Sequence, residues 1–177
     1  MKKYVFFLSC LFFSSFAFAQ NAILLSENEP TNYEGLECGY NIRNEQTKEA
    51  GGEQYSRYEV NMYITNRSGC PKVILMNNTM PNSSYGYSIN TFAIFNCLNA
   101  NGKRLTSKSA SVTAREFYIP VNLKEKNAEG KEITRTINAH AGYILRNGES
   151  INTNAIFIVP LGERPKIQCQ VVMFSNF

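Results

Sequence analysis

Histidine, aspartate and glutamate most often carry hydrolytic chemistry, and this chain offers a limited choice among these three residue types. His140 is the only histidine, and no aspartate occurs among the 177 residues. A Ser-His-Asp triad is therefore excluded as such, although a glutamate can take the orienting role. His140 lies in the segment Asn138-Ala139-His140-Ala141-Gly142, and the chain contains no GxSxG nucleophile elbow. We interpret His140 as a structural or surface residue.

The 14 glutamates are the only side-chain carboxylates, so a glycosidase-type pair would need two of them. Most of them lie in expected turns or on polar strand faces. The alternation of apolar and polar residues along the strand directs the Glu59 side chain outward, but it does not decide which way the Glu116 side chain points. We therefore predict a protein that is not an enzyme. A hydrolase with an atypical Glu- or Ser-based site is the alternative.

We expect neither a metal nor a cofactor. EF-hand loops need aspartates at early positions, and the chain has no Walker or GxGxxG phosphate loop. Four methionines together with His140 would form a soft copper-binding set. Three of these methionines lie in apolar strand-like segments, where core packing is the commoner role. The four are Met62, Met76, Met80 and Met173.

The cysteines indicate an exported protein with disulfides. Cys10 lies in the N-terminal apolar segment, and four cysteines follow it. An even set in an exported chain predicts two disulfides, and the absence of a CxxC pair disfavours zinc. Three pairings are open to four cysteines. Cys97 and Cys169 share strand phase with apolar neighbours, so our working hypothesis is Cys38–Cys70 and Cys97–Cys169.

The N-terminus predicts a cleaved secretory signal peptide over residues 1–19. Lys2 and Lys3 precede the apolar run Tyr4–Phe18, and Ala19 is followed by Gln20. Cleavage near Ala19–Gln20 would place the mature chain in the periplasm or outside the cell.

Size and charge limit the partners. Residues 20–177 fit a single domain, and the net charge of +4 includes both leader lysines. The remaining basic and acidic residues are interspersed, which argues against a nucleic-acid surface. No second apolar run reaches the roughly 20 residues that a membrane-spanning helix needs.

Strand-like alternation recurs along the chain with turn residues between the segments. Val60, Met62 and Ile64 alternate with polar neighbours, whereas Ile89–Leu98 is apolar on both faces and suits a central strand. Pro120 removes a backbone donor and favours an edge position for its strand, Phe117–Val121. Further strands are predicted over residues 73–76, 133–137, 143–145, 151–159 and 167–174, with a reversal over 99–102.

These elements predict an all-β fold, an antiparallel β-sandwich of about 7–9 strands, with a small β-barrel as the alternative. The sandwich domain should span residues 55–177. Residues 20–54 are polar, contain Gly51-Gly52 and show little periodicity. We expect them to form an N-terminal extension with little regular structure and one strand around Cys38–Ile42.

Three segments resemble a layout found in bacterial exported immunoglobulin-like domains. They are Tyr58–Asn66 with its Asn-rich turn, Phe95–Leu105 with its Asn-Gly reversal, and Leu145–Val159 with a Gly-Glu turn ahead of a long apolar strand. The resemblance spans about 100 residues and implies an immunoglobulin-like sandwich. The Cys–Trp–Cys signature of antibody domains is absent because the chain has no tryptophan. Such a fold does not fix a function.

The segment Asn77–Tyr87 is the candidate binding loop. It combines Tyr85 and Tyr87 with Asn82 and several other small polar residues, a mixture typical of binding loops on rigid scaffolds. A plain solvated connection is the alternative for this loop.

We therefore expect an exported, non-catalytic module that binds a protein partner, as an inhibitor or an envelope-associated interaction module. A glycan ranks second because no tryptophan is present to form a flat sugar platform. A structural subunit whose open sheet edge accepts a strand from a neighbour is a third possibility.

Overall fold

The computed structural model describes residues 22–75, 90–99, 102, 109–171 and 175–176. These residues form twelve strands and no helix. In chain order the strands are β1 (Ala22–Leu25), β2 (Thr31–Tyr33), β3 (Leu36–Ala50), β4 (Glu53–Asn66), β5 (Lys72–Leu75), β6 (Thr91–Leu98), β7 (Ala110–Thr113), β8 (Arg115–Lys126), β9 (Glu132–Leu145), β10 (Ser150–Pro160), β11 (Lys166–Val171) and β12 (Ser175–Asn176).

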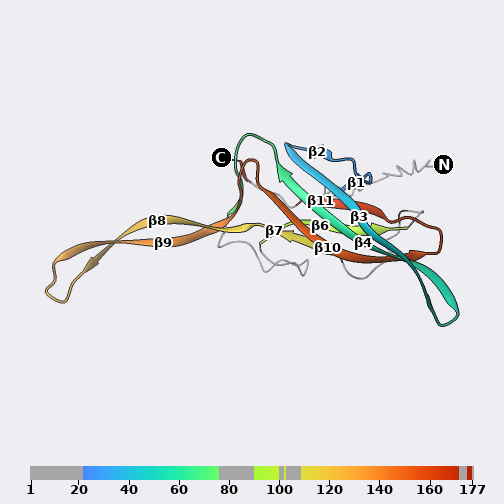
Figure 1. Ribbon diagram of the computed structural model, residues 1–177. Helices are drawn as coiled ribbons and strands as arrows, with labels where there is room; N and C mark the ends of the chain where they lie inside the picture. Colours follow the sequence, from blue (N-terminus) through green and yellow to red (C-terminus); the bar gives the residue numbers. More distant parts are fainter. Residues whose placement is uncertain (1–21, 76–89, 100–101, 103–108, 172–174, 177) are drawn as a thin grey trace, which may run out of the picture.

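The strands form three antiparallel sheets, and none of the sheets closes on itself. Their orders are β1-β11-β6-β7, β10-β4-β3-β2 and β12-β5-β9-β8. The predicted all-β sandwich is confirmed, and the strands do not form the small barrel that was the alternative. Figure 1 shows the first two sheets stacked as the body of the molecule, while β8 and most of β9 project from it.

The main core lies between the first two sheets. β4 directs Val60, Met62 and Ile64 inward, as their alternation predicts, and all three are buried. β6 and β11 supply Phe95 and Ile167 from the other sheet. β6 lies between β11 and β7 and is buried over Thr91–Phe95, which confirms its predicted central position.

The N-terminal part of the chain belongs to the sandwich, and our expectation of little regular structure over residues 20–54 is wrong. β3 runs for 15 residues and pairs with β4 from Leu36↔Asn66 to Ala50↔Glu53. Leu36, Cys38 and Tyr40 are buried in the core. Their alternation is short, and polar residues follow it because the far half of β3 extends beyond the core. With β1 and β2 also present, the strands number twelve and exceed the expected 7–9.

Other strand predictions are confirmed with shifted ends. The predicted strands at 133–137 and 143–145 are one continuous strand, β9. Pro120 lies on β8, which is an edge strand as predicted. The predicted leader, residues 1–19, lies outside the described residues.

Candidate functional site

The projecting arm is formed by β8 and β9, which pair from Lys126↔Glu132 at the tip to Arg115↔Ile144 at the root. Figure 1 shows this ribbon leaving the sandwich on the side opposite the β3–β4 hairpin. Two-stranded ribbons are marginally stable on their own in water, so the root and the side chains along the arm decide whether it holds its shape.

One face of the arm carries a row of aliphatic side chains, with Arg135 and Glu125 as the charged residues opposite Leu123 and Ile133. Directly paired residues share a face, and the pairs Ile119↔Ala139 and Val121↔Ile137 lie on the same side as Leu123 and Ile133. Three of these side chains are exposed: Ile119 by 41%, Leu123 by 37% and Ile133 by 44%. We call this set of six residues the apolar face.

The opposite face of the arm is polar. It carries Asn122, Lys124, Thr134 and Thr136, and the Thr136 hydroxyl donates to Asn122 Oδ1 at 2.8 Å. The ribbon is therefore amphipathic. Antiparallel strands show this pattern when one face packs against another surface and the other face is solvated.

The tip of the arm is closed by Asn127. Its Oδ1 accepts the backbone N–H groups of Glu129 at 3.1 Å and Lys131 at 2.8 Å. The Asn127 N–H also donates to the Lys131 carbonyl at 2.9 Å. The charged residues Lys124, Glu125 and Lys126 extend β8, which ends at Lys126 ahead of this ordered turn.

The root of the arm contains a β-bulge. Phe117 pairs with Gly142 and Tyr118 with His140, so Ala141 is the extra residue. Gly142 has φ 148°, and a Cβ there would collide with the Ile74 carbonyl of β5. Only glycine fits this conformation and this contact.

His140 lies at the root between two tyrosine rings. Its ring centroid is 5.1 Å from that of Tyr118 and 5.1 Å from that of Tyr143. Its Nε2 lies 2.9 Å from the Gly142 carbonyl oxygen. The Tyr118 hydroxyl donates to Glu116 at 2.7 Å, and this bond raises the pKa of Tyr118. These contacts fix the position of the His140 ring at the root of the arm.

The glutamates singled out from the sequence lie apart. Glu59, on β4, is half-buried and forms an ion pair with Arg57 at 2.7 Å. Glu116 is exposed on β8, in another sheet. The two carboxylates therefore do not form a glycosidase-type pair.

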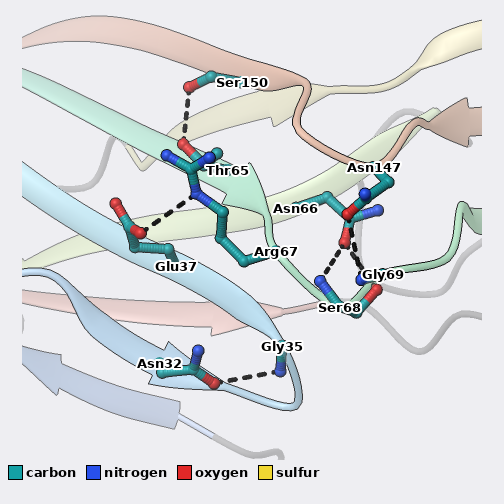
Figure 2. Close-up of polar contacts among 10 residues, drawn as sticks. All are labelled: Asn32, Gly35, Glu37, Thr65, Asn66, Arg67, Ser68, Gly69, Asn147 and Ser150. Atoms are coloured by element: carbon teal, nitrogen blue, oxygen red, sulfur yellow. Dashed lines mark hydrogen bonds and ion pairs between the residues drawn. The ribbon is translucent and has the colours of Figure 1, made fainter.

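A buried amide network fixes the root to the sandwich (Figure 2). The Asn66 side chain is fully buried, and its Nδ2 donates to the carbonyls of Cys70 at 2.8 Å and Leu145 at 2.9 Å. Its Oδ1 accepts from the Ser68 N–H at 3.0 Å and from the Ser68 hydroxyl at 2.7 Å. Asn147 Oδ1 accepts the Gly69 N–H at 3.1 Å. The end of β9 is thus held against the turn that follows β4.

An ion pair holds the other strand of the root. Arg115, the first residue of β8, contacts Glu149 Oε1 at 2.8 Å. Glu149 Oε2 accepts the Arg146 N–H at 2.9 Å, which shapes the turn between β9 and β10. Both strands of the arm are therefore anchored to this turn region.

The four cysteines of the described residues are free thiols. Cys97 pairs in register with Ile167, and Cys169 pairs with Phe95, so these two cysteines are diagonal neighbours. Diagonal Cβ atoms lie about 7–8 Å apart or somewhat less, whereas a disulfide needs about 4 Å. Cys38 and Cys169 come from opposite sheets and lie buried in the same core cluster. The hypothesised pairing of Cys38 with Cys70 and Cys97 with Cys169 is therefore wrong as a description of this structure.

The predicted binding loop, with Asn82, Tyr85 and Tyr87, lies outside the described residues. In the part of the chain that is described, no group of three or more His, Cys, Asp or Glu residues could hold a metal ion. That part also contains no helix long and apolar enough to cross a membrane.

Sequence reasoning missed the arm as a site. The signal was present in the alternation of Ile119, Val121 and Leu123 and in the turn residues Asn127 and Gly130. Comparison with known proteins gives no assignment, because no family model, curated protein or solved structure matches this chain.

Proposed function

We propose that this protein is an exported, non-catalytic module that binds a protein partner on the apolar face of the β8–β9 arm. The observation that carries the proposal is the aliphatic surface of Ile119, Leu123 and Ile133, exposed on a ribbon that projects from the sandwich. Each such side chain gains about 1.5–3 kcal/mol when it is fully buried. A partner that covers the face would therefore gain substantial binding energy.

The second projecting hairpin supports a specific role for the arm. The β3–β4 hairpin also extends from the body in Figure 1. Its end carries Thr47, Lys48, Glu49 and Gln54, and these polar residues are exposed. Projection alone therefore does not bring an apolar surface with it in this fold. Exposed isoleucines also occur on β10, at Ile156 and Ile158, but that strand belongs to the sandwich and not to a projecting hairpin.

The chemistry of the face favours a protein over a glycan. The six residues that define it are aliphatic, only Arg135 and Glu125 on the same side of the ribbon are charged, and sugars are usually held against flat aromatic rings. Aliphatic strips on one face of a ribbon suit a complementary protein surface or an added strand. The predicted leader and the even number of cysteines after it support export.

Site-specific photo-cross-linking tests the proposal. A photoreactive residue replaces Leu123, on the apolar face, or Lys124, its neighbour on the polar face, in the full chain expressed in its own host. We expect a discrete adduct with one protein from position 123 and none from position 124. Equal adducts at both positions, an adduct with lipid or glycan, or none at position 123 would contradict the proposal.

The same experiment addresses the loop. A photoreactive residue at Tyr85 or Tyr87 reports whether residues 77–87 touch the partner as well. An adduct there with the protein captured at position 123 would place the loop in the same interface, whereas an adduct there alone would move the binding surface from the arm to the loop.

A further inference from the structure

We infer that the outer face of the sheet β10-β4-β3-β2 binds a neutral glycan, with one pyranose unit stacked on the Tyr63 ring and its hydroxyl groups bound by a row of asparagine amides. The outer face is the one opposite the core, to which β4 directs Val60, Met62 and Ile64. The inference is independent of the function proposed for the arm, because β8 and β9 belong to another sheet.

The Tyr63 ring lies flat across the neighbouring strand, which has a glycine at the paired position. Tyr63 on β4 pairs with Gly39 on β3. A Cβ built on Gly39 would lie 2.5 Å from the Tyr63 hydroxyl oxygen and 2.6 Å from the ring carbon that carries this oxygen. One side of the ring therefore covers the backbone of β3. Tyr63 is only half-buried, so the ring can offer its other side to the C–H groups of a sugar.

A row of three asparagines crosses the sheet next to Tyr63. Asn61 pairs with Asn41 on β3 and with Asn154 on β10, so the three side chains share the outer face. Neighbouring strands are about 4.8 Å apart, and residues two positions apart on one strand are about 7 Å apart. The amides are therefore within reach of the hydroxyl groups of a pyranose that is stacked on Tyr63.

Asn61 is held in place at the centre of this row. It is 7% exposed, and its Nδ2 donates to Asn154 Oδ1 at 2.9 Å and to the Thr153 carbonyl at 3.5 Å. Within the part of the chain that the structure describes, Asn61 Oδ1 and the Asn41 amide form no hydrogen bond. Asparagine is depleted in strands, so strand formation does not account for three of them side by side. Amides both donate and accept, as sugar hydroxyls require.

The row on the other side of Tyr63 is polar as well. The Thr65 hydroxyl donates to the Ser150 hydroxyl at 3.0 Å, and Glu37 forms an ion pair with Arg67 at 3.5 Å, as Figure 2 shows. The three rows contain no aliphatic side chain on β3, β4 or β10. A protein interface usually has an apolar centre, whereas one aromatic ring between rows of neutral polar groups matches a hydroxyl-rich chain.

Binding to an array of immobilised neutral oligosaccharides tests the inference. The purified wild type should bind at least one class of oligosaccharide, and the same oligosaccharide in solution should compete. Tyr63→Ala should weaken this binding about 10-fold or more because the stacked ring is lost. Tyr63→Phe keeps the ring and should bind within about threefold of the wild type. If the wild type binds no oligosaccharide, the inference is overturned.

Tyr55→Ala is the matched control. Tyr55 lies on the same face of β4 but pairs with Lys48 in the projecting hairpin, away from the asparagine row. It should bind as the wild type does, and so should Leu123→Ser on the arm, which separates this site from the proposed protein-binding face. Full binding by Tyr63→Ala, or equal losses in Tyr63→Ala and Tyr55→Ala, would overturn the inference.

Two further variants keep the test decisive if Tyr63→Ala does not fold. Gly39→Ala retains Tyr63 but introduces a Cβ where the ring lies, so it should displace the ring and weaken binding. Asn41→Ala removes an amide without a hydrogen bond among the described residues, so its stability should not change and its affinity should fall about threefold or more. Unchanged affinity in both variants, with their fold verified by circular dichroism, would overturn the inference.

Discussion

Asn66 is the residue on which the root of the arm depends. Its amide satisfies the carbonyls of Cys70 and Leu145 and accepts two hydrogen bonds from Ser68. Asn66→Ala would leave these buried groups unpaired, so we expect it to lower the free energy of unfolding by about 3 kcal/mol. Denaturant unfolding measures this change.

Asn32→Ala is the matched control. Asn32 Oδ1 accepts one exposed hydrogen bond, from the Gly35 N–H at 3.1 Å, and is drawn beside the Asn66 network in Figure 2. Its loss should lower the free energy of unfolding by about 1 kcal/mol or less. Equal effects of the two variants would show that the buried network does not stabilise the root.

The Cys97 thiol should make the free energy of unfolding depend on pH in the alkaline range. Burial raises the pKa of the Cys97 thiol from the ordinary value of 9.0 to about 11. Between these values the unfolded chain has lost this proton and the folded chain has kept it, so stability falls as pH rises. We expect this thiol to lower the free energy of unfolding by about 2 kcal/mol between pH 9 and pH 11.

The comparison is with Cys97→Ala, because tyrosines and other thiols also titrate at alkaline pH. Unfolding curves of both proteins are measured at pH 8, 9, 10 and 11, which span the two pKa values. The difference in stability between wild type and variant should shrink as the pH rises. A difference that does not vary with pH would show that the Cys97 thiol ionises normally in the folded protein.

At the scale of elements, the joint between β5 and β9 depends on Gly142. Its φ of 148° and the approach of the Ile74 carbonyl leave no room for a Cβ. We expect Gly142→Ala to lower the free energy of unfolding by about 3 kcal/mol and to loosen the root of the arm. Limited proteolysis should then cut the arm faster.

Gly148→Ala is the control for backbone strain alone. Gly148 has φ 78° in the turn before β10, and nothing lies within 4 Å of a Cβ built there. We expect a loss of about 1 kcal/mol and unchanged proteolysis of the arm. If both glycine variants behaved alike, close packing of β5 on β9 would not be what fixes the root.

Alternation identified most strands because a half-buried strand shows one face to the core. It placed β4, β6 and β10 and recognised Pro120 as an edge residue. It missed most of β3, because only the first part of that strand is buried. Alternation also shows which face of a strand is apolar, but it does not show what packs against that face. Ile119 and Leu123 therefore could not be assigned to an exposed ribbon from the sequence.

Contacts between distant strands were also beyond the sequence. The strand phase correctly placed Cys97 and Cys169 in the core. Which cysteines face one another depends on how the two sheets stack, and the strand expected around Cys38–Ile42 had no predicted place in either sheet. Pairing cysteines therefore required the topology, whereas assigning their burial did not.

At the scale of the whole molecule, the sandwich acts as a rigid base for one amphipathic ribbon. Only Ala114 separates the end of β7 from the start of β8, so the chain passes directly from the core sheet into the arm. The Arg115–Glu149 ion pair and the Asn66 network hold that junction. A base of this kind would keep the apolar face pre-organised and so reduce the entropy lost in the binding that we propose.

The measurement that tests this account most directly is the Kd of the cross-linked partner for three forms of the protein. They are the wild type, the apolar-face variant Ile119→Ser with Leu123→Ser, and the polar-face variant Asn122→Ser with Lys124→Ser. Ile119 and Leu123 are 41% and 37% exposed, so a partner buries only part of each side chain. Their loss should therefore weaken binding about 10-fold or more, and the polar-face variant should bind nearly as the wild type does. Unchanged affinity of the apolar-face variant, with its fold intact, would contradict the account.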